Sequence, residues 1–444
     1  MSKFDRSRAL AQLAAIERHA AVRMLALLGG LLAIALSVTW VVHQVANNPI
    51  WPEATDMGNY LDAARRVLDG QNPYASDFGH FHRLPYPPLF GDFIAALTAL
   101  FGRHGAAYVW MTANGLAMIA AVTLIMRNFS LRVPYPWIVL FCGILAIGRS
   151  GRSDLYHGQV NFPLLLLLVL GFLLWRARRK VWASLAWAIM INVKPFLGVL
   201  VVFLMRQRDW RTTFLTLALS AAILAGSFLP MYRQSVETFV GWRQVTSYYA
   251  SPAWATNPLN QSFYGFLLRL FTHNEFSQAW ADSPALVAVG LALVSAVALT
   301  AVFLVSAPAP EVKDSGEHDL LRLATVLAAF MSIGPVTEGD HLYILLPGLI
   351  MAVTLAWRSV AAGAPRRRWW LAAAAAWFCV FMGPLSPKQF VTHFVDRADW
   401  ALLHGPGILL SGFTAVALLA AAVLTACVFW LERRDAAAPP AISA

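Results

Sequence analysis

The sequence predicts an all-α polytopic membrane protein with about twelve transmembrane helices, and three observations lead to this prediction. Of its 444 residues, 59% are hydrophobic and only 13% are charged, whereas soluble globular chains carry roughly 25% charged residues. The mean hydropathy is +0.59. Apolar stretches close to the roughly 17–25 residues that one crossing requires recur along the chain. A soluble enzyme, a disordered chain and a fibrous repeat are therefore excluded.

The distribution of charge predicts how the first span is oriented. The chain has 34 Lys and Arg against 23 Asp and Glu, a net charge of +11. Basic residues collect in the cytoplasmic loops of membrane proteins, so this excess indicates no nucleic acid partner. We therefore expect the basic arm before residue 24 to lie in the cytoplasm. The first apolar run, 24–42, lacks a small-residue cleavage site after it, which predicts an uncleaved first span.

The segment 47–104 is predicted to be the first periplasmic loop and to contain interfacial helices. It is rich in Asp, Arg and His and cannot lie in lipid. Its apolar stretch 88–102 is short and contains Asp92, so we expect it to lie in the membrane interface. If this stretch crossed the bilayer, the basic clusters 176–180 and 206–211 would fall on the outer side, against the charge rule.

The rest of the chain is predicted to complete a single transmembrane domain over residues 1–431, followed by a disordered cytoplasmic tail, 432–444. Pro195 should interrupt the apolar stretch 181–205, which gives two half-spans that meet at Lys194 and Pro195 near the outer surface. The other expected spans are 105–126, 135–148, 162–175, 212–232, 285–306, 320–336, 342–357, 369–382 and 405–431.

Polar side chains without an evident structural explanation fall on the outer side in this topology. They come from five segments far apart in the sequence: Asp56 with Tyr60; Arg152, Asp154, Gln159 and Asn161; Lys194; Asn260 with Gln261; and Asp340 with His341. We expect them to form one active site at the lipid–water boundary. At least one substrate of such a site has a lipid tail and a polar head.

The first two segments contain the residues with the clearest chemistry. Asp56 is the candidate general base, which takes a proton from an attacking hydroxyl. Its alternative role is the N-cap of the helix that follows. Arg152 is a candidate for pairing with an anion, Asp154 for binding sugar hydroxyls, and Gln159 and Asn161 for amide hydrogen bonds. A solvated turn is the alternative for these four residues.

Two cations are candidates for phosphate binding. Lys194 stands between apolar half-spans, where an unpaired charge is costly; it contacts a phosphate or, alternatively, snorkels to the surface. His341 follows an acidic residue and either binds or protonates phosphate or has a structural role. The spacing of Asp77, His80 and His82 matches no zinc or calcium signature, so no metal ligands are predicted.

A series of short motifs resembles glycosyltransferase family 87, a family of C-type, multi-span transferases that use polyprenyl-phosphate sugars. The family includes phosphatidylinositol mannoside α-1,2-mannosyltransferases and an arabinofuranosyltransferase branch. The matching motifs, in order, are DMGNY at 56–60, GQNPY at 70–74, YPPL at 86–89, GQVN at 158–161, VKP at 193–195, NQS at 260–262, and DH at 340–341 with Pro347.

The resemblance implies a C-type glycosyltransferase fold with Asp56 as the catalytic base. It assigns Asp340 and His341 to the acid–histidine pair at the mouth of a later span. It further implies a sugar donor carried on a single polyprenyl phosphate, inversion at the anomeric carbon, and no metal or other cofactor.

The expected function is transfer of a sugar, with mannose as the expected one, from a polyprenyl-phosphate donor to a lipid or glycan acceptor. We expect this on the periplasmic side of a bacterial inner membrane, with donor, acceptor and membrane lipids as partners. An arabinofuranosyl donor is the alternative within this class, because nothing in the sequence distinguishes a hexose pocket from a pentose pocket. A transporter or flippase of lipid-linked sugar is the alternative from another class. A transporter should have polar groups at the membrane midplane or on both faces, whereas the unexplained polar residues of this chain lie on one side.

Overall fold

The structure is a computed structural model that describes residues 20–48, 51–52, 55–75, 84–129, 133–230, 232–307, 316–382 and 406–437. The regular elements of these residues are helices, which confirms the prediction of an all-α chain. The N-terminal half contains α2 (Ala20–Asn47), α3 (Asp56–Leu68), α4 (Pro88–Asn128), α5 (Tyr135–Ile147), α6 (Arg149–His157), α7 (Asn161–Arg176), α8 (Lys180–Ile191), the 3₁₀ helix η2 (Pro195–Val199), α9 (Leu200–Arg206) and α10 (Trp210–Gly226).

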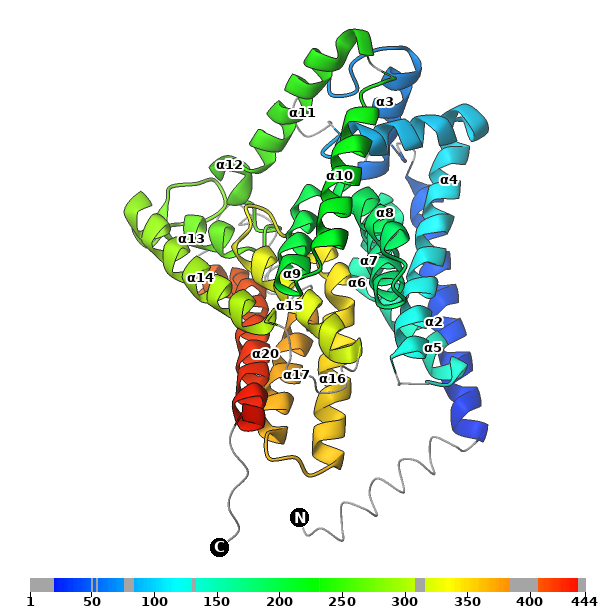
Figure 1. Cartoon of the computed structure of the whole chain (residues 1–444). Helices are drawn as coiled ribbons and strands as arrows, with labels where there is room; N and C mark the ends of the chain where they lie inside the picture. Colours follow the sequence, from blue (N-terminus) through cyan, green and yellow to red (C-terminus); the bar gives the residue numbers. More distant parts are fainter. Residues whose placement is uncertain are drawn as a thin grey trace, which may run out of the picture.

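The C-terminal half continues with further helices of very different lengths. They are the 3₁₀ helix η3 (Tyr232–Gln234), α11 (Ser235–Tyr249), α12 (Pro252–Ala255), α13 (Phe263–Phe271), α14 (Pro284–Val305), α15 (Gly316–Ile333), the 3₁₀ helix η4 (Gly339–Leu345), α16 (Leu346–Ala361), α17 (Arg367–Met382), α19 (Pro406–Ser411) and α20 (Phe413–Ala437). Figure 1 shows α16, α17 and α20 side by side, with α2 and α5 on the opposite side of the molecule.

Several of these helices are long and apolar enough to cross a membrane. Among the described residues there are five: α2, α4, α14, the η4–α16 pair and α20. A sixth results if α6 and α7, which are bent by 107°, count as one broken span. The helices α5, α8, η2–α9 and α10 are apolar but shorter. The chain is therefore a multi-pass membrane protein, and the count of twelve spans stays a prediction.

Two expected interruptions coincide with breaks in the helices. The long helix α4 contains Gly102 with φ +69°, a left-handed conformation that favours glycine, and this kink separates the expected interfacial stretch from the expected span. The second break lies between α8 and η2, where Lys194 is extended and Pro195 begins the new helix. Pro195 thus releases the chain from the helix at the position of the buried lysine.

The structure describes only part of the region around the predicted C-terminal boundary of the domain. The last helix, α20, continues to Ala437, which is beyond the expected end of the transmembrane domain at residue 431. The remainder of the expected tail, 438–444, and the segment 383–404 between the last two expected spans lie outside the described residues.

Small residues allow α2 and α5 to pack with their backbones in close contact. A Cβ atom at Gly30 would lie 2.5 Å from the backbone nitrogen of Leu140, and one at Gly143 would lie 2.6 Å from the carbonyl oxygen of Gly30. Ser37 donates a hydrogen bond of 2.8 Å to the carbonyl of Ala146 across the same interface. Close approach at small residues and interhelical hydrogen bonds are typical of helix association in lipid.

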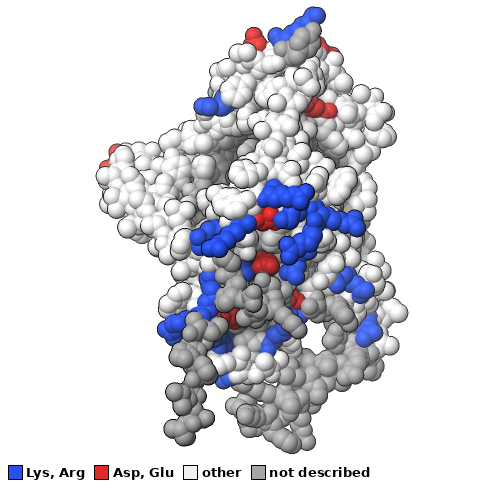
Figure 2. Space-filling view, in the orientation of Figure 1, with Lys and Arg blue, Asp and Glu red and all other residues white. Residues whose placement is uncertain are grey.

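Basic residues gather on one face of the molecule. Figure 2 shows Lys and Arg in a band across the middle of this face, in the region where Figure 1 draws the ends of α7, α8 and α9. Asp209 lies between α9 and α10 and accepts hydrogen bonds from Lys180 (2.8 Å), Trp175 (2.9 Å) and the Thr212 hydroxyl (2.8 Å). The carboxylate thereby links α7, α8 and α10.

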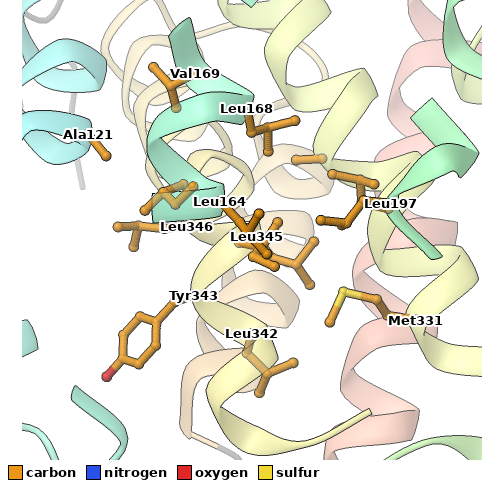
Figure 3. Close-up of a cluster of buried hydrophobic side chains, with 14 of the residues drawn as sticks. Ala121, Leu164, Leu168, Val169, Leu197, Met331, Leu342, Tyr343, Leu345 and Leu346 are labelled. Carbon is orange, nitrogen blue, oxygen red and sulfur yellow. The ribbon is translucent and has the colours of Figure 1, made fainter. Parts of the chain in front are cut away.

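Apolar side chains from α7, η2, α15 and η4 form the core behind the candidate site. Figure 3 shows Leu164, Leu168, Leu197, Met331 and Leu345 converging, and all five are buried. This packing fixes the short helix η4, because its own apolar residues are inserted among those of α7 and α15. The polar start of η4 is therefore held in a defined position.

We predict that Asp209→Ala destabilises the protein by about 2 kcal/mol, because it removes a helix cap and several hydrogen bonds of a largely buried carboxylate. Burial opposes the charge, but the hydrogen bonds, first from Lys180 and then from Trp175 and Thr212, lower the pKa of Asp209 to about 2. The stabilisation is therefore present above the ordinary aspartate pKa of about 3.9 and is lost as the pH falls toward 2.

Thermal unfolding of the two proteins in detergent tests this prediction. The melting temperatures should differ clearly at pH 7, and the difference should shrink steadily as the pH falls below 4 toward 2. Asp282→Ala is the matched control, since Asp282 is exposed and pairs with His273 at 3.6 Å. An equal loss in both variants, or a difference that does not change with pH, would contradict it.

Candidate active site

Asp56 is the first residue of α3, and its carboxylate is held by a distant part of the chain. The N-cap position is occupied by Thr55, whose hydroxyl donates to the carbonyl of Pro52 at 2.7 Å. The side-chain amide of Gln159 donates to Oδ2 of Asp56. The ring nitrogen Nδ1 of His157 lies 4.0 Å from the same oxygen. Asp56 is therefore not the N-cap, and its side chain is 39% exposed at the edge of this cluster.

Gln159 reaches Asp56 because the chain turns sharply between α6 and α7. Gly158 has φ +68°, and a Cβ there would lie 3.1 Å from the sulfur of Met57. Trp110 donates to the carbonyl of Gly158 at 2.7 Å, and Asn114 donates to the carbonyl of Gln159. Both donors come from α4, so this helix fixes the turn.

Two tyrosines, Tyr60 on α3 and Tyr86 just before α4, extend the hydrogen-bond network of Gln159. The hydroxyl of Tyr86 donates to Oε1 of Gln159 at 3.3 Å, and the hydroxyl of Tyr60 donates to that of Tyr86 at 3.2 Å. Both tyrosines are buried. Burial raises the pKa of each well above its usual value, so both remain neutral donors. The amide of Gln159 is consequently oriented with its nitrogen toward Asp56.

A second chain of hydrogen bonds contains Lys194, Asn161 and Asp154. Lys194 donates to Oδ1 of Asn161 at 2.7 Å, and Nδ2 of Asn161 donates to Oδ1 of Asp154 at 2.6 Å. All three side chains are buried. Oδ2 of Asp154 has no hydrogen-bond partner among the described residues. Lys194 therefore does not snorkel, and its charge is compensated inside the protein.

The start of η4 contributes two acidic residues and a histidine to the same region. Ser153 donates to Oδ2 of Asp340 at 3.4 Å, which connects η4 to α6. Nε2 of His341 lies 4.0 Å from a carboxylate oxygen of Glu338, and its ring lies 5.8 Å from that of Phe196. The core shown in Figure 3 thus places η4 beside the turn that carries Gln159.

The cluster contains more acidic than basic groups. The ammonium of Lys194 interacts electrostatically with Asp56, Asp154, Glu338 and Asp340. The protein around the partly exposed Asp56 removes much of its hydration and raises its pKa, although His157, Lys194 and Gln159 oppose the shift. Burial, with repulsion from Asp56, raises the pKa of Glu338 to about 7. Around neutral pH, part of the negative charge near Lys194 is therefore removed by protonation.

Three of the expected site residues make their described contacts elsewhere. The guanidinium of Arg152 lies 4.7 Å from the ring centre of Trp40 on α2. The side chain of Asn260 makes four hydrogen bonds to backbone groups, of Ala255, Pro335, Ser262 and Thr337. Gln261 is buried, and its backbone N–H donates to the carbonyl of Thr337 at 2.6 Å. Asn260 thus fixes the segment before η4, and the binding roles of these residues stay predictions.

Sequence reasoning assigned no role to four residues of this cluster. Tyr86 lies in a quoted family motif, which was a usable signal, and Glu338 lies two residues before Asp340. His157 and Asn114 carried no such signal, because an isolated histidine and an asparagine inside an apolar helix are common. The positions 77, 80 and 82, considered for metal binding, lie outside the described residues.

The fold and this cluster define a membrane-embedded enzyme with an accessible carboxylate beside a buried cation. Comparison with known proteins identifies its family: residues 84–331 match glycosyltransferase family 87. The chain belongs to this family and is a glycosyltransferase.

A curated relative from Mycolicibacterium smegmatis (strain ATCC 700084 / mc(2)155) is 25% identical over 377 residues, which cover 77% of this chain and 80% of the relative. It is named a polyprenol-phosphate-mannose-dependent alpha-(1-2)-phosphatidylinositol mannoside mannosyltransferase. No solved structure shows a significant match.

We predict that Gln159→Leu shifts the pH dependence of sugar transfer. The hydrogen bond from Gln159 lowers the pKa of Asp56, so its loss should raise that pKa further. If the carboxylate must be ionised for transfer, the variant enzyme should begin to lose activity on acidification at a higher pH than the wild type. The acidic limb of the kcat/KM profile should therefore move to higher pH. Gln234→Leu is the matched control, since the amide of Gln234 donates to the carbonyl of Gly70 at 3.0 Å, outside the candidate site. An unchanged limb in Gln159→Leu would exclude this positioning role.

Proposed function

We propose that this enzyme transfers mannose from a polyprenyl-phosphate donor to a hydroxyl of a lipid or glycan acceptor. Membership in family 87 and the name of the mycolicibacterial relative support this donor. The observation that carries the proposal is the accessible carboxylate of Asp56, which is oriented by Gln159 and lies in the electrostatic field of Lys194.

Asp56 acts as the general base in the proposed reaction. Its carboxylate takes the proton of the acceptor hydroxyl while the hydroxyl oxygen attacks the anomeric carbon from the face opposite the phosphate. The bond between the anomeric carbon and the phosphate oxygen breaks, and polyprenyl phosphate leaves with both bonding electrons. The new glycosidic bond has inverted configuration. A raised pKa suits this role, because it increases the basicity of the carboxylate.

Lys194 is the proposed cation for the phosphate that leaves. Preorganised charges of this kind stabilise the negative charge that develops in the transition state. The surrounding carboxylates would repel a phosphate if all were ionised, so the raised pKa of Glu338 is significant. Arg152 and His341 remain candidates for contacting the same phosphate. Asp154, Asn161 and the other expected binding residues either contact the sugar or hold those that do.

The proposed topology places the N-terminus in the cytoplasm and the reaction at the periplasmic surface of the inner membrane. The shorter apolar helices α5, α8, η2–α9, α10, α15 and α17 then complete about twelve crossings. The basic ends of α7 and α9 support this orientation, because positive residues favour the cytoplasmic side.

We predict that Asp56→Asn reduces sugar transfer by about 10²–10⁴-fold, because it removes the general base. Binding of the donor should persist. The measurement is transfer of labelled mannose by purified protein in detergent, together with a donor-binding assay. Asp62→Asn is the matched control on the same helix, where Asp62 pairs with Arg103 at 2.9 Å. Retained turnover in Asp56→Asn would exclude the base assignment.

The identity of the sugar can be tested in cells. We predict that a strain lacking this protein accumulates a lipid or glycan that is one hexose lighter than the normal product. Mass spectrometry of extracted lipids and glycans measures the difference. Loss of a pentose instead would identify an arabinofuranosyl-type donor and contradict mannose transfer.

A further inference from the structure

A pocket with a volume of about 380 Å³ lies between the ends of α14 and α20. The pocket residues, as we call them, come from these two helix ends: Phe303, Leu304, Ala307, Trp430, Arg433 and Arg434. None of them belongs to the candidate active site, which is built from α3, α6, the segment after α8, and η4. The pocket is therefore a separate feature with its own chemistry.

Two arginines, Arg433 and Arg434, line this pocket, and a third, Arg206, lies against Phe303 beside it. Arg206, from the end of α9, lies 4.1 Å from the ring centre of Phe303 and donates to its carbonyl at 3.1 Å. Arg433 donates to the carbonyls of Leu304 and Ala307. Arg434 lies 5.3 Å from the ring centre of Trp430. Arginines from α9 and α20 therefore gather at the end of α14.

Among the described side chains, no carboxylate forms an ion pair with the three arginines of this group. Arg433 is additionally repelled by Arg322 and Arg206. Nε of Arg206 is buried without a hydrogen-bond partner among the described residues. The carbonyls at the end of α14 supply only a partial negative charge.

The pocket borders a surface suited to acyl chains. Phe303 and Trp430 are 61% and 45% exposed, and the face of α14 that leads to Phe303 exposes Val289, Leu293 and Leu299. Most of α14 is not covered by other helices. Aromatic rings at such positions are typical of the membrane interface, where apolar surface meets charged groups.

We propose that an anionic phospholipid binds here, with its phosphate headgroup beside Arg206 and Arg434 at the rim of this apolar pocket and its acyl chains against the pocket wall and the exposed face of α14. Basic pockets between transmembrane helices are suited to such headgroups. A neutral phospholipid would leave the arginines uncompensated. A soluble anion alone would leave the apolar wall uncovered. The lipid would join α9, α14 and α20, whose ends meet here.

Native mass spectrometry of the full-length protein in detergent tests this proposal. The protein is titrated with phosphatidylglycerol and, separately, with phosphatidylcholine. One phosphatidylglycerol should bind more tightly than any phosphatidylcholine. The double variant Arg206→Gln/Arg434→Gln should bind it about 30-fold more weakly, as expected for two arginines near a lipid headgroup. Binding of phosphatidylcholine should not change.

Arg211→Gln is the matched control, because it removes one charge from the same basic region but from a residue outside the pocket. If the double variant does not fold, as judged by size-exclusion chromatography, Arg434→Gln alone replaces it, since this side chain is exposed. A loss of several-fold is then expected.

Three results would overturn the proposal. These are an affinity for phosphatidylglycerol that the pocket variants retain, an equal loss in Arg211→Gln, and equal binding of both phospholipids. A protein dimer that disappears in the pocket variants would instead assign the pocket to a second copy of the chain.

Discussion

The turn between α6 and α7 is the constraint on which the arrangement of the candidate site depends. Gly158 permits the sharp change of direction, and Gln159 then faces α3 instead of continuing a helix. A buried amide must satisfy both its donor and its acceptor, and Asp56 and Tyr86 do so from separate segments. The position of Asp56 is thus determined by contacts on α4, α6 and α7 as well as by α3.

Lys194 is a buried charge, and its partners also come from other segments of the chain. The break at Pro195 leaves the lysine in an extended segment, from which its ammonium reaches Asn161 on α7. The nearby carboxylates offset the cost of taking this charge out of water. Because several of them share one cation, their protonation states depend on one another. A phosphate that enters this region would meet an ammonium already fixed in place.

The two sides of the protein use charge in different ways. Near Asp56, single polar groups are held by specific hydrogen bonds, and the proposed reaction uses two of them, Asp56 and Lys194. At the basic side, the ion pair of Arg358 with Glu317 (3.1 Å) connects α16 to α15, and Arg322 pairs with Asp319 within α15 (3.0 Å). Buried pairs of this kind mainly specify how helices meet. The arginines beside α14 differ from them because no carboxylate among the described side chains forms an ion pair with them.

The sequence by itself determined the helical membrane class, the breaks near Gly102 and Pro195, and the family motifs, because these follow from local composition and backbone chemistry. It also predicted that Asp56, Gln159, Asn161 and Lys194 share one site. Only the tertiary structure decided their partners: Gln159 binds Asp56 although 103 positions separate them, whereas Asn260 is occupied by backbone groups. Hydrogen-bond partners depend on the relative position of packed helices, and no local pattern in the chain encodes that distance.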